Sequence, residues 1–480
     1  MENPLAKVRL ADRIVRGSFL YGPQRLFVSR WGYMFAYKNH VAIYHALTIS
    51  IVLLTISQYE RLQAVCANDE AVGHVEDWID ELIDAKLLVC SKEDDSKIYK
   101  HIQTAMPPPC VSIMQLILAD TCNLACKYCF IGRNAAEYDS KNNLQGGHLM
   151  SEAVADKAID FFERQIARVP EYVQSPKDII FYGGEPLLNF STLRHVIRRV
   201  RWDQQNGRIS QTVNFMLITN GTLLTSDVVA FLKKENVLVS LSLDGVDEVA
   251  NDNRVDRIGR PVFGKVMEAI KQARSQGLNF GLSVTLTPHT LLQREELLKF
   301  LIDNGIESLS FNILLGKNTP EYNMSAGRFI IDFYKVARSK GIKEDRMLRK
   351  IKAFSRRSFY YHDCAALSGN QIVVLPDGSV GVCQGQIGEK AASITHVNDL
   401  SADVGVSDVV KQWMARSPIN MNECRDCPAI GICGGGCPIN ARDVYGGFSR
   451  LDERFCVHTL TSLDFLIGDI CEDMVPSGAL

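Results

Sequence analysis

The sequence predicts an α/β protein built around a partial (β/α)6 barrel, with a smaller module on either side. Between residues 112 and 340, apolar stretches of strand length alternate with amphipathic stretches of helix length. Such alternation is typical of parallel strands joined by right-handed crossovers. Three consecutive prolines, Pro107 to Pro109, mark a boundary with residues 1–105, because proline continues neither a helix nor an inner strand. A cysteine-rich tail is expected over residues 341–480.

Residues 1–105 are expected to form a winged-helix-like module. The apolar run Val41–Ile56 is too short to span a bilayer and is interpreted as buried strands. Ser57-Gln58-Tyr59-Glu60 has the form of a capping box and predicts the start of a short helix. A second helix is predicted over Val75–Asp84, and a closing strand over Leu87–Val89. The module either recognises a peptide or only packs against the rest of the chain.

Six strands and five helices are predicted for the barrel region. The strands are expected at Ile113–Leu118, Asp178–Tyr182, Val213–Thr219, Val237–Leu243, Asn279–Leu286 and Ser308–Leu314. The helices are expected at Glu152–Arg168, Thr192–Arg201, Asp227–Glu235, Val262–Gln276 and Leu291–Asn304. A loop with three cysteines follows the first strand, Gly183-Gly184-Glu185-Pro186 follows the second, Asn220-Gly221 follows the third, and Asp244-Gly245 ends the fourth. Because the carboxyl ends of parallel strands meet at one edge, these loops are expected to share one mouth.

The composition limits the class of protein. The net charge is −2, which gives no indication of nucleic-acid or membrane binding. Fourteen cysteines without a secretory signal indicate a reducing, cytoplasmic setting, where clustered cysteines bind metal or do redox work. Four cysteines outside the motifs below are expected to be small buried residues: Cys66, Cys90, Cys110 and Cys471.

Three cysteines follow the first predicted strand: Cys122, Cys126 and Cys129, spaced C-x3-C-x2-C. A cubane iron–sulfur cluster normally takes four thiolates, so three would leave one iron open to another ligand. Zinc binding with a distant fourth ligand and a thiol redox pair are the alternatives. The motif resembles the cluster loop of the radical S-adenosylmethionine (radical SAM) enzymes. That resemblance implies a [4Fe-4S] cluster whose open iron is chelated by the amino and carboxylate groups of the cofactor.

The same resemblance implies a set of cofactor contacts. Gly183-Gly184-Glu185-Pro186 matches the segment that binds the methionine amino group of S-adenosylmethionine. Ser242 matches a position near the ribose or the carboxylate, Arg254 matches a position that pairs with the carboxylate, and Tyr128 matches a position near the adenine. Without the resemblance, these residues would be taken for a turn and a solvated surface arginine. No general base is identified.

Seven cysteines of the tail match the pattern of a SPASM domain, which follows the barrel in many peptide-modifying radical SAM enzymes. They are Cys364, Cys383, Cys424, Cys427, Cys433, Cys437 and Cys456. The resemblance implies two auxiliary [4Fe-4S] clusters, one held by Cys424, Cys427, Cys433 and Cys456, the other by Cys364, Cys383 and Cys437. The second set lacks a fourth cysteine, so an iron is left open unless Cys471 or a non-cysteine ligand fills it. A zinc ribbon is the structural alternative.

An auxiliary iron that is open to a substrate thiolate implies thioether formation in a ribosomally made peptide, as in the ranthipeptide and sactipeptide maturases. The implied partners are a precursor peptide with a leader segment and an external one-electron donor of flavodoxin or ferredoxin type. Carbon–carbon crosslinking and formylglycine-type oxidation are rival outcomes. The latter enzymes carry an aspartate where this chain has Gln384. A non-catalytic, zinc-containing peptide-binding protein is the remaining alternative.

Overall fold

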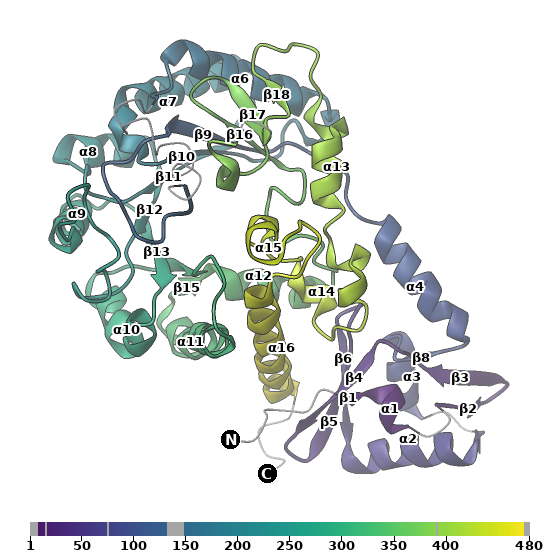
Figure 1. Ribbon diagram of the computed structural model, residues 1–480. Helices are drawn as coiled ribbons and strands as arrows, with labels where there is room; N and C mark the ends of the chain where they lie inside the picture. The colour runs from purple at the N-terminus through teal and green to yellow at the C-terminus, as the bar shows by residue number, and fades with distance from the viewer. Residues whose placement is uncertain (1–7, 15–16, 74–75, 132–147, 390–391, 475–480) are drawn as a thin grey trace.

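The computed structural model describes residues 8–14, 17–73, 76–131, 148–389 and 392–474. In the described part, the strands form one ten-stranded sheet and two four-stranded sheets. Figure 1 shows the large curved sheet with its helices on one side of the molecule and the two small sheets at the opposite end. Most helices of the cysteine-rich tail lie between them, while its strands join the large sheet.

The six predicted barrel strands are present and run parallel to one another. They occur close to the predicted positions, as β9 (Ile113–Ala119), β10 (Lys177–Gly183), β11 (Val213–Thr219), β12 (Leu238–Ser242), β13 (Phe280–Leu286) and β14 (Ser308–Ile313). Their order in the sheet follows their order in the chain. The predicted α/β fold with parallel strands is therefore confirmed.

The five predicted helices are also present, and a sixth follows β14. They are α6 (Glu152–Ala167), α7 (Phe190–Gln205), α8 (Ser226–Lys234), α9 (Phe263–Ser275), α10 (Arg294–Asp303) and α11 (Pro320–Ala337). Hydroxyl caps fix several starts: the Ser151 side chain accepts a hydrogen bond from the N–H of Val154, and the Thr225 side chain accepts one from the N–H of Val228.

Burial alternates along β10 to β14, whereas six of the seven residues of β9 are buried. In β10 and β13, every second residue is buried and the residues between are partly exposed. Side chains on a strand point alternately to the two faces. The buried set, such as Phe181 and Phe215, belongs to the main hydrophobic core, and the other set faces the inside of the curved sheet. The barrel therefore has a partly open interior, which we call the lumen.

The tail extends the barrel sheet at the edge formed by β9. Strand β16 (Gln371–Val374) pairs in parallel with β9, and β17 (Ser379–Gly381) and β18 (Thr395–His396) continue the sheet. At the other edge, β15 (Lys343–Glu344) pairs with β14. The sheet is thus ten strands wide rather than six, and it includes strands from both the predicted barrel range and the predicted tail range.

The N-terminal unit contains two sheets. One has the order β1-β4-β5-β6 and the other β7-β2-β3-β8. The bounds are β1 (Val8–Arg9), β2 (Ser18–Tyr21), β3 (Gln24–Val28), β4 (Gly32–Tyr37), β5 (His40–His45), β6 (Ser50–Thr55), β7 (Ala71–Val72) and β8 (Leu88–Val89), with helices α1 (Leu10–Arg13), α2 (Ile56–Asn68), α3 (Asp77–Asp84) and α4 (Lys92–Thr104). The apolar run expected to form strands provides most of β5 and all of β6.

The predicted capping box was misplaced by two residues. Helix α2 is capped by Thr55, whose hydroxyl accepts from the N–H of Gln58, while the Gln58 side chain accepts from the N–H of Thr55. The sequence Thr55-x-x-Gln58 also fits the capping-box pattern, and it lies directly at the end of β6, so Ser57 falls inside the helix. Helix α3 was predicted over Val75–Asp84; Val75 lies outside the described residues.

The tail contains short helices and one long one. They are α12 (Asp345–Arg356), α13 (Asp408–Met414), α14 (Ile430–Cys433), α15 (Pro438–Tyr445) and α16 (Glu453–Met474). The tail also binds the N-terminal unit: the Tyr33 hydroxyl donates to the carbonyl of Asp426 at 2.9 Å, and Gly431 packs so closely on the carbonyl of Ala46 that a side chain would not fit.

Candidate functional site

The three-cysteine loop begins where β9 ends, as the motif order predicts. A second loop, which follows β12, fixes it from one side. The N–H of Ala125 donates to the carbonyl of Val255 at 2.8 Å, and the N–H of Lys127 donates to the carbonyl of Asn253 at 2.9 Å. Arg257 adds a side-chain contact, with its Nε donating to the carbonyl of Cys122 at 2.9 Å. The cysteines are thus held by backbone pairing to a segment more than 120 residues later in the sequence.

Gly183 and Gly184 hold the loop from the other side. A Cβ atom on Gly183 would lie 2.2 Å from the carbonyl oxygen of Ala119, and a Cβ on Gly184 would lie 2.2 Å from that of Thr121. The N–H of Gly184 donates to Ala119, and the N–H of Glu185 donates to Thr121. Glycine is required here because the backbone of the cysteine loop passes directly over this turn.

The Glu185 side chain is engaged with the protein. Its carboxylate is fully buried and accepts hydrogen bonds from the Thr219 hydroxyl at 2.7 Å and from the N–H groups of Asn220 at 2.8 Å and Leu187 at 3.0 Å. Burial raises the pKa of Glu185 to about 6. Glu185 therefore ties the end of β11 to the glycine turn, and Pro186 opens the short helix that follows.

Arg254, Asp244 and Tyr128 form a buried group beside the cysteines. The Arg254 guanidinium lies 3.1 Å from the Asp244 carboxylate and 5.8 Å from the centre of the Tyr128 ring, and the Tyr128 hydroxyl donates to Asp244 at 2.5 Å. Although burial opposes its charge, the Asp244 carboxylate raises the pKa of Arg254 above its ordinary value. Arg254 is thus a buried, paired cation and not the surface arginine of the alternative interpretation.

Ser242 ends β12 and is partly exposed on the lumen side. An amide near the mouth contacts the first cysteine. The Asn220 Nδ2 lies 3.7 Å from the Cys122 sulfur and 2.9 Å from the Asn123 Oδ1, and the N–H of Leu124 donates to the same sulfur at 3.4 Å. Hydrogen bonds to a cluster sulfur are one means by which a protein sets its reduction potential.

The three thiols of the loop are close enough to influence one another. Burial, followed by the proximity of Glu185, Cys126 and Cys129, raises the pKa of Cys122 to about 12, and burial also raises that of Cys126. Such thiols are neutral when free and become thiolates when they bind metal. The donor set therefore fits an iron–sulfur cluster.

Among the tail cysteines, neighbouring thiols influence one another's pKa in two sets. Burial first, and then Cys364 and Cys437, raise the pKa of Cys383 well above its ordinary value. The pKa of Cys456 is raised by burial and then by the other three cysteines of its predicted set, Cys433, Cys427 and Cys424. Over the described ranges, no three His, Cys, Asp or Glu side chains converge as ligands of a single metal ion, whereas a cubane binds its thiolates at separate irons.

Polar contacts surround these groups. The N–H of Cys437 donates to Asp452 at 3.2 Å, and Asp452 pairs with the buried Arg454 at 2.7 Å. The Lys350 ammonium donates to the carbonyl of Cys433 at 2.9 Å and lies 3.5 Å from Asp363, the neighbour of Cys364. Lys350 thus contacts the backbone of Cys433, which belongs to the four-cysteine set, and Asp363, which is next to Cys364 of the three-cysteine set.

The four remaining cysteines take no part in these groups. Cys66 and Cys471 are fully buried, Cys110 is half-buried and Cys90 is exposed, so the expectation of a buried residue is wrong for Cys90. The pKa of Cys471 is raised by burial alone. Cys471 lies fifteen residues beyond Cys456 on α16, about 22 Å along the helix axis, which places it far from the other thiols.

Several contacts of the site were not anticipated. Asn220 was noted only as part of a loop, and Arg257 and Lys350 were not identified. Asp244 was noted for its place at a strand end, which was a usable indication, because acidic residues at that edge of a parallel sheet commonly belong to sites. The partners of Lys350 lie too far along the sequence to be inferred from spacing.

A partial parallel barrel with a three-thiol loop at the carboxyl end of its first strand defines a class of metal-dependent enzymes. The sequence profile of the Radical SAM superfamily matches residues 116–301. The chain is 23% identical to the radical SAM cyclopropyl synthase TigE of Paramaledivibacter caminithermalis, over 80% of this chain and 81% of that protein. It is 24% identical to a cysteine-type anaerobic sulfatase-maturating enzyme of Clostridium perfringens, over 69% and 89%.

The fold agrees with these sequence matches. The structure of anSMEcpe with bound AdoMet superimposes with a TM-score of 0.61 at 20% identity, covering 77% of this chain and 97% of that one. Residues 116–301 are therefore similar to a radical SAM domain, a type of domain that implies S-adenosylmethionine and a [4Fe-4S] cluster, and most of the chain is similar to a radical SAM synthase and to sulfatase-maturating enzymes. None of the described helices is both long and apolar enough to cross a membrane.

Proposed function

We propose that Cys122, Cys126 and Cys129 hold the catalytic [4Fe-4S] cluster. When bound, the cluster and S-adenosylmethionine supply a one-electron cleavage that yields a hydrogen-abstracting carbon radical. The backbone of Gly183 and Gly184 fixes the cysteine loop. The polar groups of the segment Gly183–Pro186 that do not contact this loop are assigned to the amino group of the cofactor.

The other contacts of the cofactor are assigned by position. Arg254 provides a buried positive charge beside Cys126, which suits the cofactor carboxylate. Tyr128, stacked on that arginine, is assigned to the adenine. Ser242, partly exposed at the end of β12, is assigned to the ribose or the carboxylate.

Two auxiliary [4Fe-4S] clusters are proposed for the tail. Cys424, Cys427, Cys433 and Cys456 would fully ligate one of them. Cys364, Cys383 and Cys437 would hold the other: after burial, Cys437 raises the pKa of Cys364, and Cys364 and Cys437 raise the pKa of Cys383. A cluster bound there would offer one coordination position and accept an electron.

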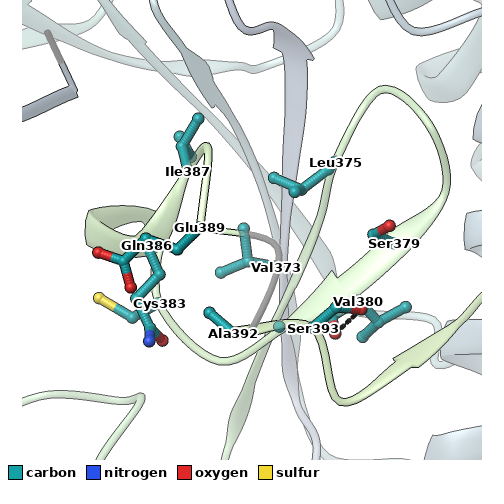
Figure 2. Close-up of a pocket in the computed structure, with 11 residues that line it drawn as sticks. Val373, Leu375, Ser379, Val380, Cys383, Gln386, Ile387, Glu389, Ala392 and Ser393 are labelled. Carbon is teal, nitrogen blue, oxygen red and sulfur yellow. Dashed lines mark hydrogen bonds between the residues drawn. The ribbon is translucent and has the colours of Figure 1, made fainter. Parts of the chain in front are cut away.

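From this three-thiol group we infer that the enzyme is a maturase that forms a thioether in a ribosomally made peptide. The vacant position would take a cysteine thiolate of the substrate, lowering its pKa and fixing its sulfur. Cys383 lines a small pocket that Val373 and Ile387 also line (Figure 2). The three-thiol set is the observation on which the proposal depends.

The proposed partners follow from this chemistry. The substrate is a precursor peptide, for which the N-terminal unit, residues 1–105, would provide leader recognition by strand addition to a sheet edge. Residues 112–340 would be the radical SAM barrel and residues 341–480 the SPASM domain. An external flavodoxin- or ferredoxin-type donor would reduce the catalytic cluster.

A second candidate, modification at carbon without a thioether, is favoured by the similarity to TigE, a cyclopropyl synthase, which extends over most of both chains. Formylglycine-type oxidation is favoured by the sulfatase-maturating relatives. Gln384 stands where those enzymes carry an aspartate that accepts a proton, and an amide cannot take that role. This residue counts against the formylglycine alternative.

Coexpression with short cysteine-containing reading frames beside the gene tests the proposal. Thioether closure removes two hydrogens and one thiol that iodoacetamide can alkylate, whereas a carbon–carbon bond removes two hydrogens and leaves every thiol. Cys126→Ala should abolish 5′-deoxyadenosine formation. Cys383→Ala should retain it and lose the crosslink, and the exposed Cys90→Ala should match the wild type. A product that keeps all its thiols would refute thioether formation.

A further inference from the structure

A turn of three consecutive glycines joins the two cysteine sets of the tail. It runs from Gly434 to Gly436, between Cys433, which belongs to the four-cysteine set, and Cys437, which belongs to the three-cysteine set. The three glycines have positive φ angles of 73°, 87° and 69°, a backbone conformation that other residues rarely adopt. At this turn, the two sets are separated only by residues that carry no side chain.

Backbone groups from other parts of the tail pack directly on the glycine turn. The N–H of Asp363, the neighbour of Cys364, donates to the carbonyl of Gly434 at 2.9 Å. A Cβ atom on Gly435 would lie 2.7 Å from the carbonyl oxygen of Arg416. Because both neighbours are backbone groups in close contact with the turn, the position of Arg416 relative to the two cysteine sets is fixed.

The Arg416 side chain is a buried cation at this turn and is only 5% exposed. Its Nη2 donates to the carbonyl of Gly435 at 3.2 Å, and its Nη1 donates to the carbonyl of Phe448. Its Nε–H is buried and has no hydrogen-bond partner among the residues that the structure describes. Buried donors and buried charges are normally paired, because leaving them unpaired is costly.

The acidic side chain that influences Arg416 is already engaged. Asp452 forms an ion pair with another arginine at 2.7 Å. Burial lowers the pKa of Arg416, whereas Asp452 and then Cys437 of the three-cysteine set raise it. Cys424 and Cys433 of the four-cysteine set also raise it. Arg416 is therefore close to both sets, whose thiols become thiolates when they bind metal.

We propose that Arg416 is the shared counter-cation of the two auxiliary clusters, and that its Nε–H donates a hydrogen bond to a sulfur of one of them. This inference rests on the auxiliary clusters of the proposed function and adds a residue that sets their reduction potentials. A thiolate-ligated cubane is negatively charged and becomes more so when it accepts an electron. A buried cation and a hydrogen bond to sulfur both stabilise the reduced form. Arg416 is thus a positioning residue that makes the clusters better acceptors of the electron released on bond closure.

EPR-monitored redox titration of the reconstituted full chain tests this proposal. Arg416→Gln removes the charge, and we expect each auxiliary cluster to bind an electron at least about tenfold more weakly, a decrease of about 59 mV for one electron. Arg416→Lys retains the charge and should stay within about threefold of the wild type. Arg425→Gln is the matched control, because it removes the same charge from an exposed residue next to Cys424. Solvent screens that charge, so the potentials should stay within about twofold of the wild type.

Pulsed EPR supplies a readout that a purely structural role of Arg416 would not change. The enzyme is prepared with arginine that carries nitrogen-15 in the guanidinium group, and its clusters are reduced with dithionite. We expect a nitrogen-15 coupling to a reduced auxiliary cluster in the wild type and in Arg425→Gln. The coupling should be lost in Arg416→Lys, which has no guanidinium group, even if Arg416→Gln does not retain its clusters.

Iron content separates the possible failures. Three [4Fe-4S] clusters bring about twelve irons per chain, and the catalytic cluster alone brings about four. With about twelve irons bound, unchanged potentials in Arg416→Gln, a shift confined to one cluster, or equal nitrogen-15 couplings in the wild type and Arg416→Lys would overturn the role of Arg416 while the proposed clusters stand. About four irons in the wild type would overturn the auxiliary clusters and this inference together.

Discussion

Replacing Gly184 by alanine should displace the cysteine loop. The new Cβ would lie 2.2 Å from the carbonyl oxygen of Thr121, 2.4 Å from its carbonyl carbon and 2.9 Å from the nitrogen of Cys122. Side-chain Cβ atoms do not approach other atoms closer than 3.0 Å, so the two segments must separate by about 0.8 Å. All three neighbours are backbone atoms, and the hydrogen bonds of Gly184 to Ala119 and of Glu185 to Thr121 resist the movement.

The displacement acts on Cys122, the first proposed ligand. A misplacement of this size near a reacting centre costs about a hundredfold in rate, and we expect 5′-deoxyadenosine formation to fall by about that factor. The assays are iron content after anaerobic reconstitution and cleavage of S-adenosylmethionine under dithionite. Gly264→Ala is the matched control, because its Cβ would meet nothing within 4 Å. Wild-type iron content and cleavage in Gly184→Ala would refute the reasoning.

Three further outcomes are expected. Burial raises the pKa of Glu185 from 4.5 to about 6, so the contribution of Glu185 to the free energy of unfolding is greatest below pH 4.5 and falls by about 2 kcal/mol as the pH rises through 6. Glu185→Gln should remove this pH dependence from denaturation midpoints measured across the pH range. A profile equal to that of the wild type would contradict the prediction. Lys350→Met removes a buried cation that contacts the backbone of Cys433 and the side chain of Asp363. Loss of this positive charge should lower the reduction potential of a proposed auxiliary cluster, measured by EPR-monitored titration. An unaltered potential would show that Lys350 does not influence either cluster. Arg257→Gln should weaken iron retention at least about tenfold on dialysis against chelator, since a charge-assisted hydrogen bond is worth about 1.5–3 kcal/mol and Arg257 donates one to the Cys122 carbonyl. Equal retention would show that the backbone pairing suffices.

The barrel was predictable because its information is local. Each strand is an apolar run of the right length, and each helix shows its own periodicity, so β9 to β14 and α6 to α10 were placed within a few residues. The grouping of the cysteines by spacing also agrees with the electrostatic grouping of the thiols. The misplaced start of α2 shows the limit of such reasoning, because Thr55 and Ser57 both fit a capping box and only the end of β6 decides between them.

The rest depends on pairing between distant segments. Strand β16 has only four residues, Gln371–Val374, and nothing in that stretch indicates that it adds to β9, more than 250 residues earlier. The segment around Asn253 contacts the cysteine loop through backbone hydrogen bonds. Such bonds do not depend on the type of side chain, so the sequence does not indicate them. The sequence predicted the position of Glu185 but not the direction of its side chain. It was expected at the cofactor, whereas its carboxylate accepts hydrogen bonds from Thr219 and Asn220 at the end of β11.

The lumen also constrains the chemistry that the two thiol groups can share. From Ile113 to Ala119, β9 rises about 20 Å, with the cysteine loop beyond its carboxyl end. Strands β16 and β17 return the chain to the level of Gln115 at Gly381, shortly before Cys383. A substrate sulfur held at the Cys383 group can meet a carbon attacked near the cysteine loop only if both approach the level of Tyr182. That residue is the one whose pKa responds to Cys129 and Cys383 together. Under the proposed function, thioether closure therefore requires the sulfur to reach the level of Tyr182. If the sulfur stays farther down the lumen, a cluster at the Cys383 group would serve only to accept an electron, and the expected product is a bond between carbons.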